Sequence, residues 1–445
     1  MRNGRWALAV ICATALLAGA ESRRPFAAQQ RAKGPATPMD RIAEGYVKLV
    51  LAMGAHDADY VDAYYGPSEW KTEAAAAKPG LDAIASRAAT LLGELGRTPP
   101  GGDEMVTLRR QYLERQLSAL AARVRILKGE RLTFDQESKA LYDAVAPTYP
   151  DTHFQQILAK LAQRFPGKGP LVTRYEAFRR QFVIPPAKLD AVFKLAIQAC
   201  RERTAAHVKL PAGEQFTVEY VKNKSWSGYN WYQGGFRSLI QVNTDLPIYI
   251  DRAVDLACHE GYPGHHVYNA LLETHLVKER GWIEFSIYPL FSPQSLIAEG
   301  TANFGIEVAF PGRERVEFEQ RVLFPAAGLD SSKAAAYYDA QTLVDRLSYA
   351  GNEAARRYLN GYISASTAAT WLEQYALMPA ERAKQRVRFF DQYRSYVINY
   401  NLGKDMVRQY IESRGGTPDH ADTRWAEFEK LLSSPRLPSG LGAGR

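Results

Sequence analysis

The stretch LERQLSALAARVRIL, residues 113–127, repeats apolar side chains at alternating intervals of four and three residues. Side chains at these intervals lie on one face of an α-helix, so the stretch predicts an amphipathic helix within residues 103–128. Its apolar stripe indicates a hydrophobic core rather than a functional surface. The positions that form the stripe are Leu113, Leu117, Leu120, Val124 and Leu127.

Helical periodicity continues on both sides of this stretch. Thr133 and Gln136 are typical of a capping box, which predicts that a further helix begins there. We therefore predict a mainly α fold, organised as a single large helical domain. Its other helical segments, separated by proline and glycine, are residues 151–164, 186–205, 333–360 and 380–412.

Residues 215–249 depart from the helical pattern. They contain FTVEYV and FRSLIQVNTDLPI, whose β-branched and alternating residues predict a short β-hairpin or edge strands. The strand over residues 237–243 either presents a free edge to an extended peptide or only stabilises the domain.

The two ends of the sequence predict export and flexibility. Residues 1–20 combine a basic start, an apolar run and the sequence Ala-Gly-Ala, which is typical of a secretory signal peptide. The apolar run is shorter than the roughly 20 residues that span a bilayer, and no later stretch reaches that length. We expect an exported protein, periplasmic or extracellular, with no membrane span after cleavage. Residues 21–38 are predicted to form a flexible leader, residues 39–432 the helical domain, and residues 433–445 a disordered tail.

Composition indicates a folded protein without a nucleic-acid partner. The sequence is 46% hydrophobic and 23% charged, which excludes a disordered chain. Its net charge is +8, but basic and acidic residues are interspersed and no basic block occurs. Cys200 and Cys258 remain after signal cleavage, and they form either one disulfide or two buried thiols.

The sequence CHEGYPGHH, residues 258–266, indicates a metal site. Catalytic zinc is bound by His and Asp/Glu side chains, and the HExxH motif places two histidines one helical turn apart. Here Pro263 occupies the position of the second histidine, and His265 and His266 follow His259 by six and seven residues. Because proline breaks the helical hydrogen bonding, we expect a bulge that lets one of these two histidines act as the second ligand.

Two glutamates complete the predicted site. Glu260, next to His259, corresponds to the general base of HExxH enzymes. Glu299 lies in SPQSLIAEGTANFGIE, a helical segment in which an acid among apolar residues is costly unless it is paired or binds metal. Glu307 and Glu284 are the competing candidates for the third ligand, and His275 is expected to be a surface residue.

HEGYPGHH followed by the helical segment with Ala298-Glu299-Gly300 resembles the bacterial domain-of-unknown-function family 885. Members of that family carry HExxPGHH and then an EGWALY-like segment, and they are similar in pattern to mainly helical zinc peptidases of the gluzincin type. The resemblance covers most of the chain from about residue 100 to 412, with its specific content in the octapeptide and the AEG segment.

The resemblance implies a zincin-like domain with a zinc cofactor (Zn²⁺). It implies His259, His265 and Glu299 as metal ligands, with His266 as the alternative to His265, and Glu260 as the catalytic acid/base. Two positions depart from the family pattern, in which tryptophan and leucine stand where this sequence has Thr301 and Asn303. Asn303, one turn beyond Glu299, is expected to donate a hydrogen bond to it.

The segment DQYRSYVINYNLGKDM, residues 391–406, supplies candidate donors for a developing oxyanion. These candidates are Arg394, Tyr396 and Tyr400, and the segment resembles the family's C-terminal Tyr/Gly segment. The two tyrosines, at a spacing of four, are equally typical of an amphipathic helix core.

Together these features predict an exported zinc-dependent hydrolase, most simply a metallopeptidase that acts on a peptide or another small amide substrate. One alternative is a hydrolase that cuts an amide or ester outside proteins, such as a cell-wall fragment. The other is a noncatalytic scaffold protein with a structural metal site.

Overall fold

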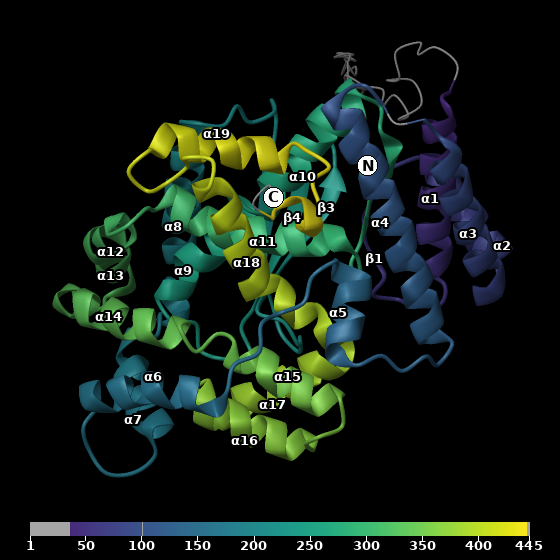
Figure 1. The fold of residues 1–445 in the computed structure, drawn as a ribbon. Coiled ribbons are helices and arrows are strands. Elements are labelled where there is room, and N and C mark those ends of the chain that lie inside the picture. Colours follow the sequence, from purple (N-terminus) through teal and green to yellow (C-terminus); the bar gives the residue numbers. More distant parts are fainter. Residues whose placement is uncertain (1–35, 100, 443–445) are drawn as a thin grey trace, which may run out of the picture. The chain divides into compact units, whose positions relative to one another are not determined.

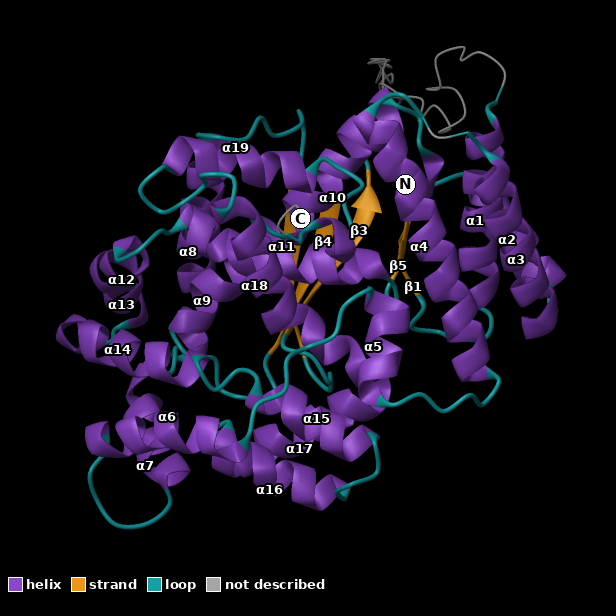
Figure 2. Ribbon diagram, viewed as in Figure 1, coloured by secondary structure: helices purple, strands orange, loops and turns teal. Residues whose placement is uncertain are grey.

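The computed structural model describes residues 36–99 and 101–442 (Figure 1). The predicted signal peptide and most of the predicted leader lie outside the described residues. Helices dominate the described chain and a few short strands lie between them, which confirms the predicted mainly α fold (Figure 2). No described helix has both the length and the apolar character needed to cross a bilayer.

The predicted amphipathic helix is α4 (Glu104–Leu127), and its apolar stripe is buried except at Leu127, which is partly exposed. α4 packs against α3 and α1 at one side of the domain (Figure 1). The predicted capping box is also present, because Thr133 Oγ1 accepts from the Gln136 amide and Gln136 Oε1 accepts from the Thr133 amide. The helices of this part of the chain are α1 (Pro38–Met53), α2 (Ser68–Ala77), α3 (Leu81–Arg97) and α5 (Phe134–Tyr142).

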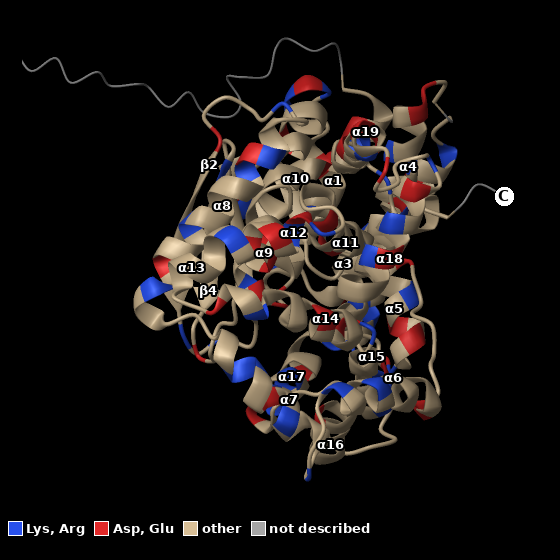
Figure 3. Ribbon diagram, turned by 90° about the vertical axis from the view of Figure 1, so that its left-hand side faces the viewer, with Lys and Arg blue, Asp and Glu red and all other residues tan. Residues whose placement is uncertain are grey.

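The other predicted helical segments are present, two of them divided by short breaks. The segment 333–360 is split between α14 and α15, and the segment 380–412 between α17 and α18. Basic and acidic residues are interspersed along these helices and the others in this view (Figure 3). The remaining helices are α6 (Asp151–Arg164), α7 (Leu171–Arg179), α8 (Leu189–Ala205), α9 (Asp251–Leu256), α10 (His265–Leu272), α11 (Pro293–Ala309), α12 (Glu314–Phe318), α13 (Phe324–Ala327), α14 (Ala334–Asp345), α15 (Ala350–Leu359), α16 (Ala365–Tyr375), α17 (Ala380–Tyr393), α18 (Ile398–Glu412) and α19 (Ala421–Leu432).

The β element before the histidine motif contains the predicted hairpin, formed by two antiparallel strands, and a further strand extends it to a three-stranded sheet. Its order is β2 (Gln215–Val221), β4 (Arg237–Asn243) and β3 (Gly228–Gly234), with β4 parallel to β2 and antiparallel to β3. Of the two roles left open for the strand over residues 237–243, the free edge is excluded, because β4 is paired on both sides. The edge strand nearest the site is β3, which comes from the turn-rich sequence SWSGYNWYQGG.

A second, two-stranded sheet joins distant parts of the chain. β1 (Val61–Tyr64) pairs antiparallel with β5 (Ile287–Pro289), which directly precedes α11. Neither strand is indicated by the sequence, since both are very short.

The close crossing of α11 and α18 forms the centre of the fold. A Cβ atom on Gly300 would lie 2.5 Å from the Gly403 carbonyl carbon, and one on Gly403 would lie 2.8 Å from the Leu296 carbonyl oxygen. The two helices can approach this closely only because both positions are glycine. The crossing brings Tyr396 and Tyr400 next to Glu299.

The chain remains packed beyond the predicted end of the domain. Leu437 and Leu441 are buried, and the Ser439 amide donates to Asp143 Oδ2. Composition predicts disorder from residue 433, but these two leucines give the described part of the tail, up to residue 442, an apolar anchor.

Candidate metal centre

The helix that carries the histidine motif is interrupted where the sequence predicts. α9 continues into a π-helical segment, Ala257–Gly261, and α10 starts again at His265 after a cis Tyr262–Pro263 peptide. The Gly264 amide donates to the Cys258 carbonyl at 2.9 Å, and a Cβ atom on Gly264 would lie 1.8 Å from the His259 carbonyl oxygen. A glycine is therefore required at this position for the break to close.

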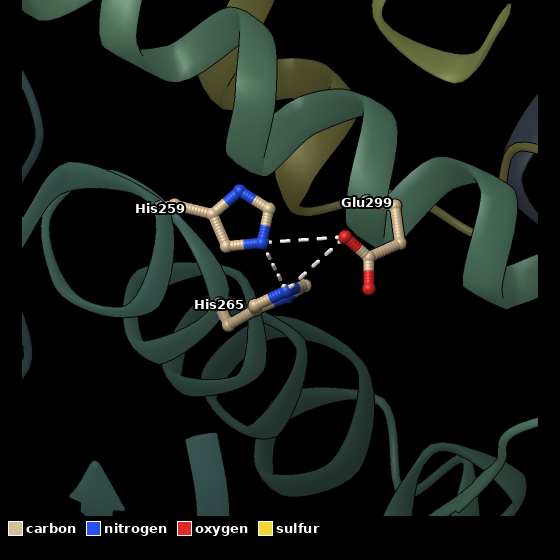
Figure 4. A group of neighbouring side chains, drawn as sticks. All are labelled: His259, His265 and Glu299. Carbon is tan, nitrogen blue, oxygen red and sulfur yellow. Dashed lines mark hydrogen bonds and ion pairs between the residues drawn. The ribbon is translucent and has the colours of Figure 1, made fainter. Parts of the chain in front are cut away.

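Three predicted ligand groups meet beside this break (Figure 4). His259 Nε2 lies 3.2 Å from His265 Nε2 and 3.2 Å from Glu299 Oε2, and His265 Nε2 lies 3.8 Å from Glu299 Oε2. Ligands at the roughly 2.0–2.1 Å distances typical of zinc stand about 3.3 Å apart in a tetrahedral site. The three atoms therefore have the spacing of ligands to one small cation.

The surroundings of Glu299 also fit a bound cation. Its Oε2 atom is buried and accepts no hydrogen bond, although two imidazole nitrogens face it. Burial opposes ionisation of this carboxyl, but His259 and His265 outweigh that effect and hold its pKa well below the usual value. An ionised, buried oxygen without a donor is the kind of atom that a divalent cation satisfies.

His266 lies outside the three-residue cluster. Its ring is fully buried, with Nε2 3.0 Å from Glu214 Oε2 and Nδ1 2.9 Å from Ser238 Oγ. His266 follows His265 by one residue on α10, so its side chain points about 100° around the helix from that of His265. It therefore lies away from Glu299 and toward the three-stranded sheet. Of the two candidate second ligands, the structure brings His265 to the cluster and gives His266 a separate buried network.

The competing carboxylates and the last histidine also lie elsewhere. Glu307 forms ion pairs with Lys404 and Arg408, and Glu284 pairs with Arg109. His275 is an exposed residue 3.0 Å from Glu279.

Glu260 is buried in the wall of a cavity of about 1000 Å³ that also contains the three ligand groups. Burial raises the pKa of its carboxyl, and the nearby His259 and His265 partly oppose that shift. The edge strand β3 approaches Glu260 closely: Asn230 Nδ2 donates to its main-chain oxygen at 2.7 Å, and a Cβ atom on Gly228 would lie 2.7 Å from its Oε1.

The predicted oxyanion donors have different positions. Tyr396 donates its hydroxyl to Glu299 Oε1 at 2.8 Å, so it orients the ligand carboxylate. Tyr400 lines the cavity beside the ligand groups. Burial, and next the charge of Glu299, raise the pKa of both Tyr396 and Tyr400 well above the usual value, so both hydroxyls keep their protons. Asn303 donates to the Glu299 carbonyl at 3.0 Å rather than to its carboxylate.

Arg394 does not reach the centre, which corrects the prediction that it is a catalytic donor. Its Nε donates to Glu137 Oε2 at 2.6 Å, and it is absent from the cavity wall. The reason is local: Arg394 has a φ of 52° at the junction after α17, which turns its side chain toward α5.

Asp62 is a site residue that the sequence did not suggest. It lies in the cavity wall on β1, accepts a hydrogen bond from the Tyr229 hydroxyl, and interacts electrostatically with His265. Burial raises its pKa to about 7. No local signal marks it, because only the pairing of β1 with β5 brings it to the site.

A disulfide joins Cys200 on α8 to Cys258, the residue before His259, with a Cα–Cα distance of 5.7 Å. It anchors the π-helical segment of the motif to α8. Of the two states that the sequence left open for these cysteines, the structure shows the disulfide.

The chain matches no protein-family model and no curated protein. Among solved structures it is similar to a predicted lipoprotein from Colwellia psychrerythraea, with 14% identity, a TM-score of 0.46, and 82% of this chain and 72% of that chain covered. It is also similar to a predicted lipoprotein of unknown function from Shewanella oneidensis, with 12% identity, a TM-score of 0.39, and 82% and 76% of the two chains covered.

Proposed function

We propose that the protein is an exported zinc-dependent hydrolase, and specifically a metallopeptidase. One observation carries this proposal: His259, His265 and Glu299 present three ligand atoms to one point, and the buried Glu260 stands beside them in a large cavity. Two histidines and a glutamate are a ligand set of catalytic rather than structural zinc. A purely structural site would also have no need of a general base such as Glu260.

Each residue of the proposed site then has a defined role. His259, His265 and Glu299 would hold the zinc ion, which supplies Lewis acidity to the reaction. Glu260 accepts the proton of the attacking water and passes it to the leaving nitrogen. Tyr396 fixes the orientation of Glu299 through its hydrogen bond, and Tyr400 keeps a protonated hydroxyl in the cavity for the developing oxyanion.

The edge strand β3 supports a peptide substrate over another amide or ester. Residues 228–230 of β3 line the cavity, and β3 is paired through β4 alone within its sheet. An extended peptide can add to such an edge by main-chain hydrogen bonds. Gly228, which has no side chain, lets the Glu260 carboxylate lie directly against this strand.

The disulfide supports export. Disulfides persist in oxidising compartments such as the periplasm or the extracellular space and are rare in the cytosol. The Cys200–Cys258 bond lies directly beside the proposed centre, so the folded site itself contains the oxidised pair.

The test combines metal analysis with the Glu260→Gln variant on a mixed peptide library. We expect stoichiometric zinc in the wild-type protein and in the variant, and a loss of hydrolysis of about 10²–10⁴-fold in the variant only. Glu69→Gln, at an exposed position of α2, is the matched control and should keep full activity. Absence of stoichiometric metal would disprove the proposal, and metal without peptide cleavage would favour the non-protein substrate.

A further inference from the structure

α17 places two arginines, Arg382 and Arg386, in the wall of the cavity. They are four residues apart, so their side chains share one face of the helix. Both are partly buried, and neither forms an ion pair with a carboxylate in the described part of the chain. Arg386 Nε is buried and donates no hydrogen bond.

Three other arginines in the same wall form ion pairs with carboxylates, and the remaining one, Arg346, is exposed rather than buried. Arg315 lies 2.8 Å from Asp255, Arg252 lies 3.0 Å from the same residue, and Arg408 lies 2.6 Å from Glu307. Among the described residues, the fold therefore directs carboxylates to three arginines of this wall but to neither Arg382 nor Arg386.

A buried guanidinium without an anion is costly to the folded state. Burial, and then the charges of Arg252, Arg179 and Arg386 in that order, together lower the pKa of Arg382 to about 10, with Asp251 partly opposing the shift. Positive charge is therefore concentrated at this end of the cavity. The guanidinium fork matches a carboxylate in a bidentate hydrogen bond, which would remove the cost.

Arg386 interacts with residues of the proposed metal centre. The pKa of Arg386, lowered by burial, is partly restored by the neighbouring Tyr400 and Glu299. The Arg386 guanidinium carbon also lies 5.7 Å from the centre of the Tyr400 ring. An anion held by Arg386 would lie in the same cavity as a group at the metal, so that one bound molecule can carry both.

We infer that Arg382 and Arg386 form a carboxylate-binding subsite, so that the molecule hydrolysed at the centre carries a carboxylate close to the bond that is cut. This inference rests on the proposed function for the reaction but not for the binding itself. The carboxylate is either the free end of a peptide or an acidic side chain next to the scissile bond.

Binding measured by calorimetry tests the subsite. It also distinguishes a carboxylate at the free end of a peptide from one on an acidic side chain. The probes are acetyl-dialanine with a free carboxylate, acetyl-alanyl-glutamate amide, and the neutral acetyl-dialanine amide. The full-length protein carries Glu260→Gln to prevent turnover. We expect one of the two charged probes to bind about 10-fold or more tightly than the neutral amide, as charge-assisted hydrogen bonds predict.

Variants of α17 show whether the preference comes from the arginine pair. Arg386→Gln and Arg382→Gln should each remove most of the preference, whereas Arg388→Gln, on the exposed face of α17, should keep it. The preference should also persist in His259→Ala and in chelator-treated protein, which excludes direct binding of the carboxylate to a metal.

Equal binding of all three probes would overturn the inference, as would a preference that survives in both Arg386→Gln and Arg382→Gln. A preference that disappears with the metal would overturn it as well. Because binding is read without hydrolysis, loss of the proposed peptidase activity leaves these outcomes unchanged, and the two proposals fail separately.

Discussion

The hydroxyl of Tyr396 donates to Glu299 Oε1, while Oε2 of the same carboxylate faces His259 and His265. The tyrosine thus fixes which oxygen is offered to a metal. Residues that orient a ligand in this way typically change metal affinity by about 10–100-fold when removed.

We therefore expect Tyr396→Phe to weaken zinc binding by about 10–100-fold, measured by competition with a chromophoric chelator. Tyr393→Phe is the matched control, because Tyr393 lies in the same cavity wall without a hydrogen bond to Glu299. Unchanged zinc affinity in Tyr396→Phe would contradict the orienting role.

His265 and His266 should separate metal binding from stability. His265→Ala is expected to lose stoichiometric zinc while the metal-free protein keeps its melting temperature within a few degrees. His266→Ala should retain zinc but lose about 2 kcal/mol of unfolding free energy, because the buried Glu214 loses a hydrogen-bond partner. Metal analysis and urea denaturation of both variants check this, and the reverse pattern would assign the ligand to His266.

The sequence predicted site residues well where several functional side chains lie close together in one short segment. Spacing within the histidine motif indicated His259 with either His265 or His266, and the apolar setting favoured Glu299, whereas the complete set of three was implied by the family resemblance. Arg394 was misplaced because a single backbone dihedral decides its direction, and such a dihedral is not readable from residue type. Asp62 was missed because its role depends on a strand pairing between segments far apart in the chain.

At the scale of elements, the glycine contact between α11 and α18 positions Tyr396 and Tyr400 relative to Glu299. Gly403→Ala should push the helices apart, since the added Cβ atom would lie 2.8 Å from the Leu296 carbonyl oxygen. We expect a loss of about 1–3 kcal/mol of unfolding free energy together with weaker zinc binding.

The chain provides a glycine control for that experiment. A Cβ atom added to Gly351, inside α15, would meet no heavy atom within 4 Å beyond its own helix backbone. Gly351→Ala should therefore be neutral or stabilising by up to about 1 kcal/mol. Thermal unfolding and zinc titration of both alanine variants make the comparison. Equal effects would show that helix propensity, and not the crossing, determines the result.

Elements with strong periodicity could be predicted, and those built from turn residues could not. α4 and α6 agree closely with the predicted ranges, because burial of one helical face leaves a clear pattern. β3 was hidden, since Gly228, Asn230 and Gly234 are typical of turns and only pairing with β4 makes the segment a strand.

For the whole molecule, metal and fold should be thermodynamically coupled, because the ligand atoms come from two sides of the helix break and from α11. A ligand that binds only the folded state at about 1000 times its Kd adds about 4 kcal/mol of stability. We expect chelation to lower the melting temperature of the wild-type protein and re-addition of zinc to restore it. His259→Ala should be insensitive to both treatments, and a chelator effect of the same size in that variant would contradict the coupling.

The arrangement of the helices and strands in space was the feature least predictable from the sequence. The sequence indicated one mainly helical domain, but the sheet order, the pairing of β1 with β5, and the packing of residues 433–442 all depend on contacts between distant segments. These contacts depend on how the surfaces of distant elements pack together, and no local pattern in a single sequence indicates that packing.

Every residue of α11 is buried or only partly exposed, and the helix makes contacts on each of its sides. Glu299 faces His259 of the candidate metal centre, Gly300 touches α18, and Gly305 leaves room for the ring of Pro263 at the helix break. Substitutions at Gly300 or Gly305 would therefore disturb the packing around the helix that carries Glu299. Attempts to redesign the specificity of the protein would do best to keep α11 unchanged and to vary α17 and β3, which border the cavity without carrying a metal ligand.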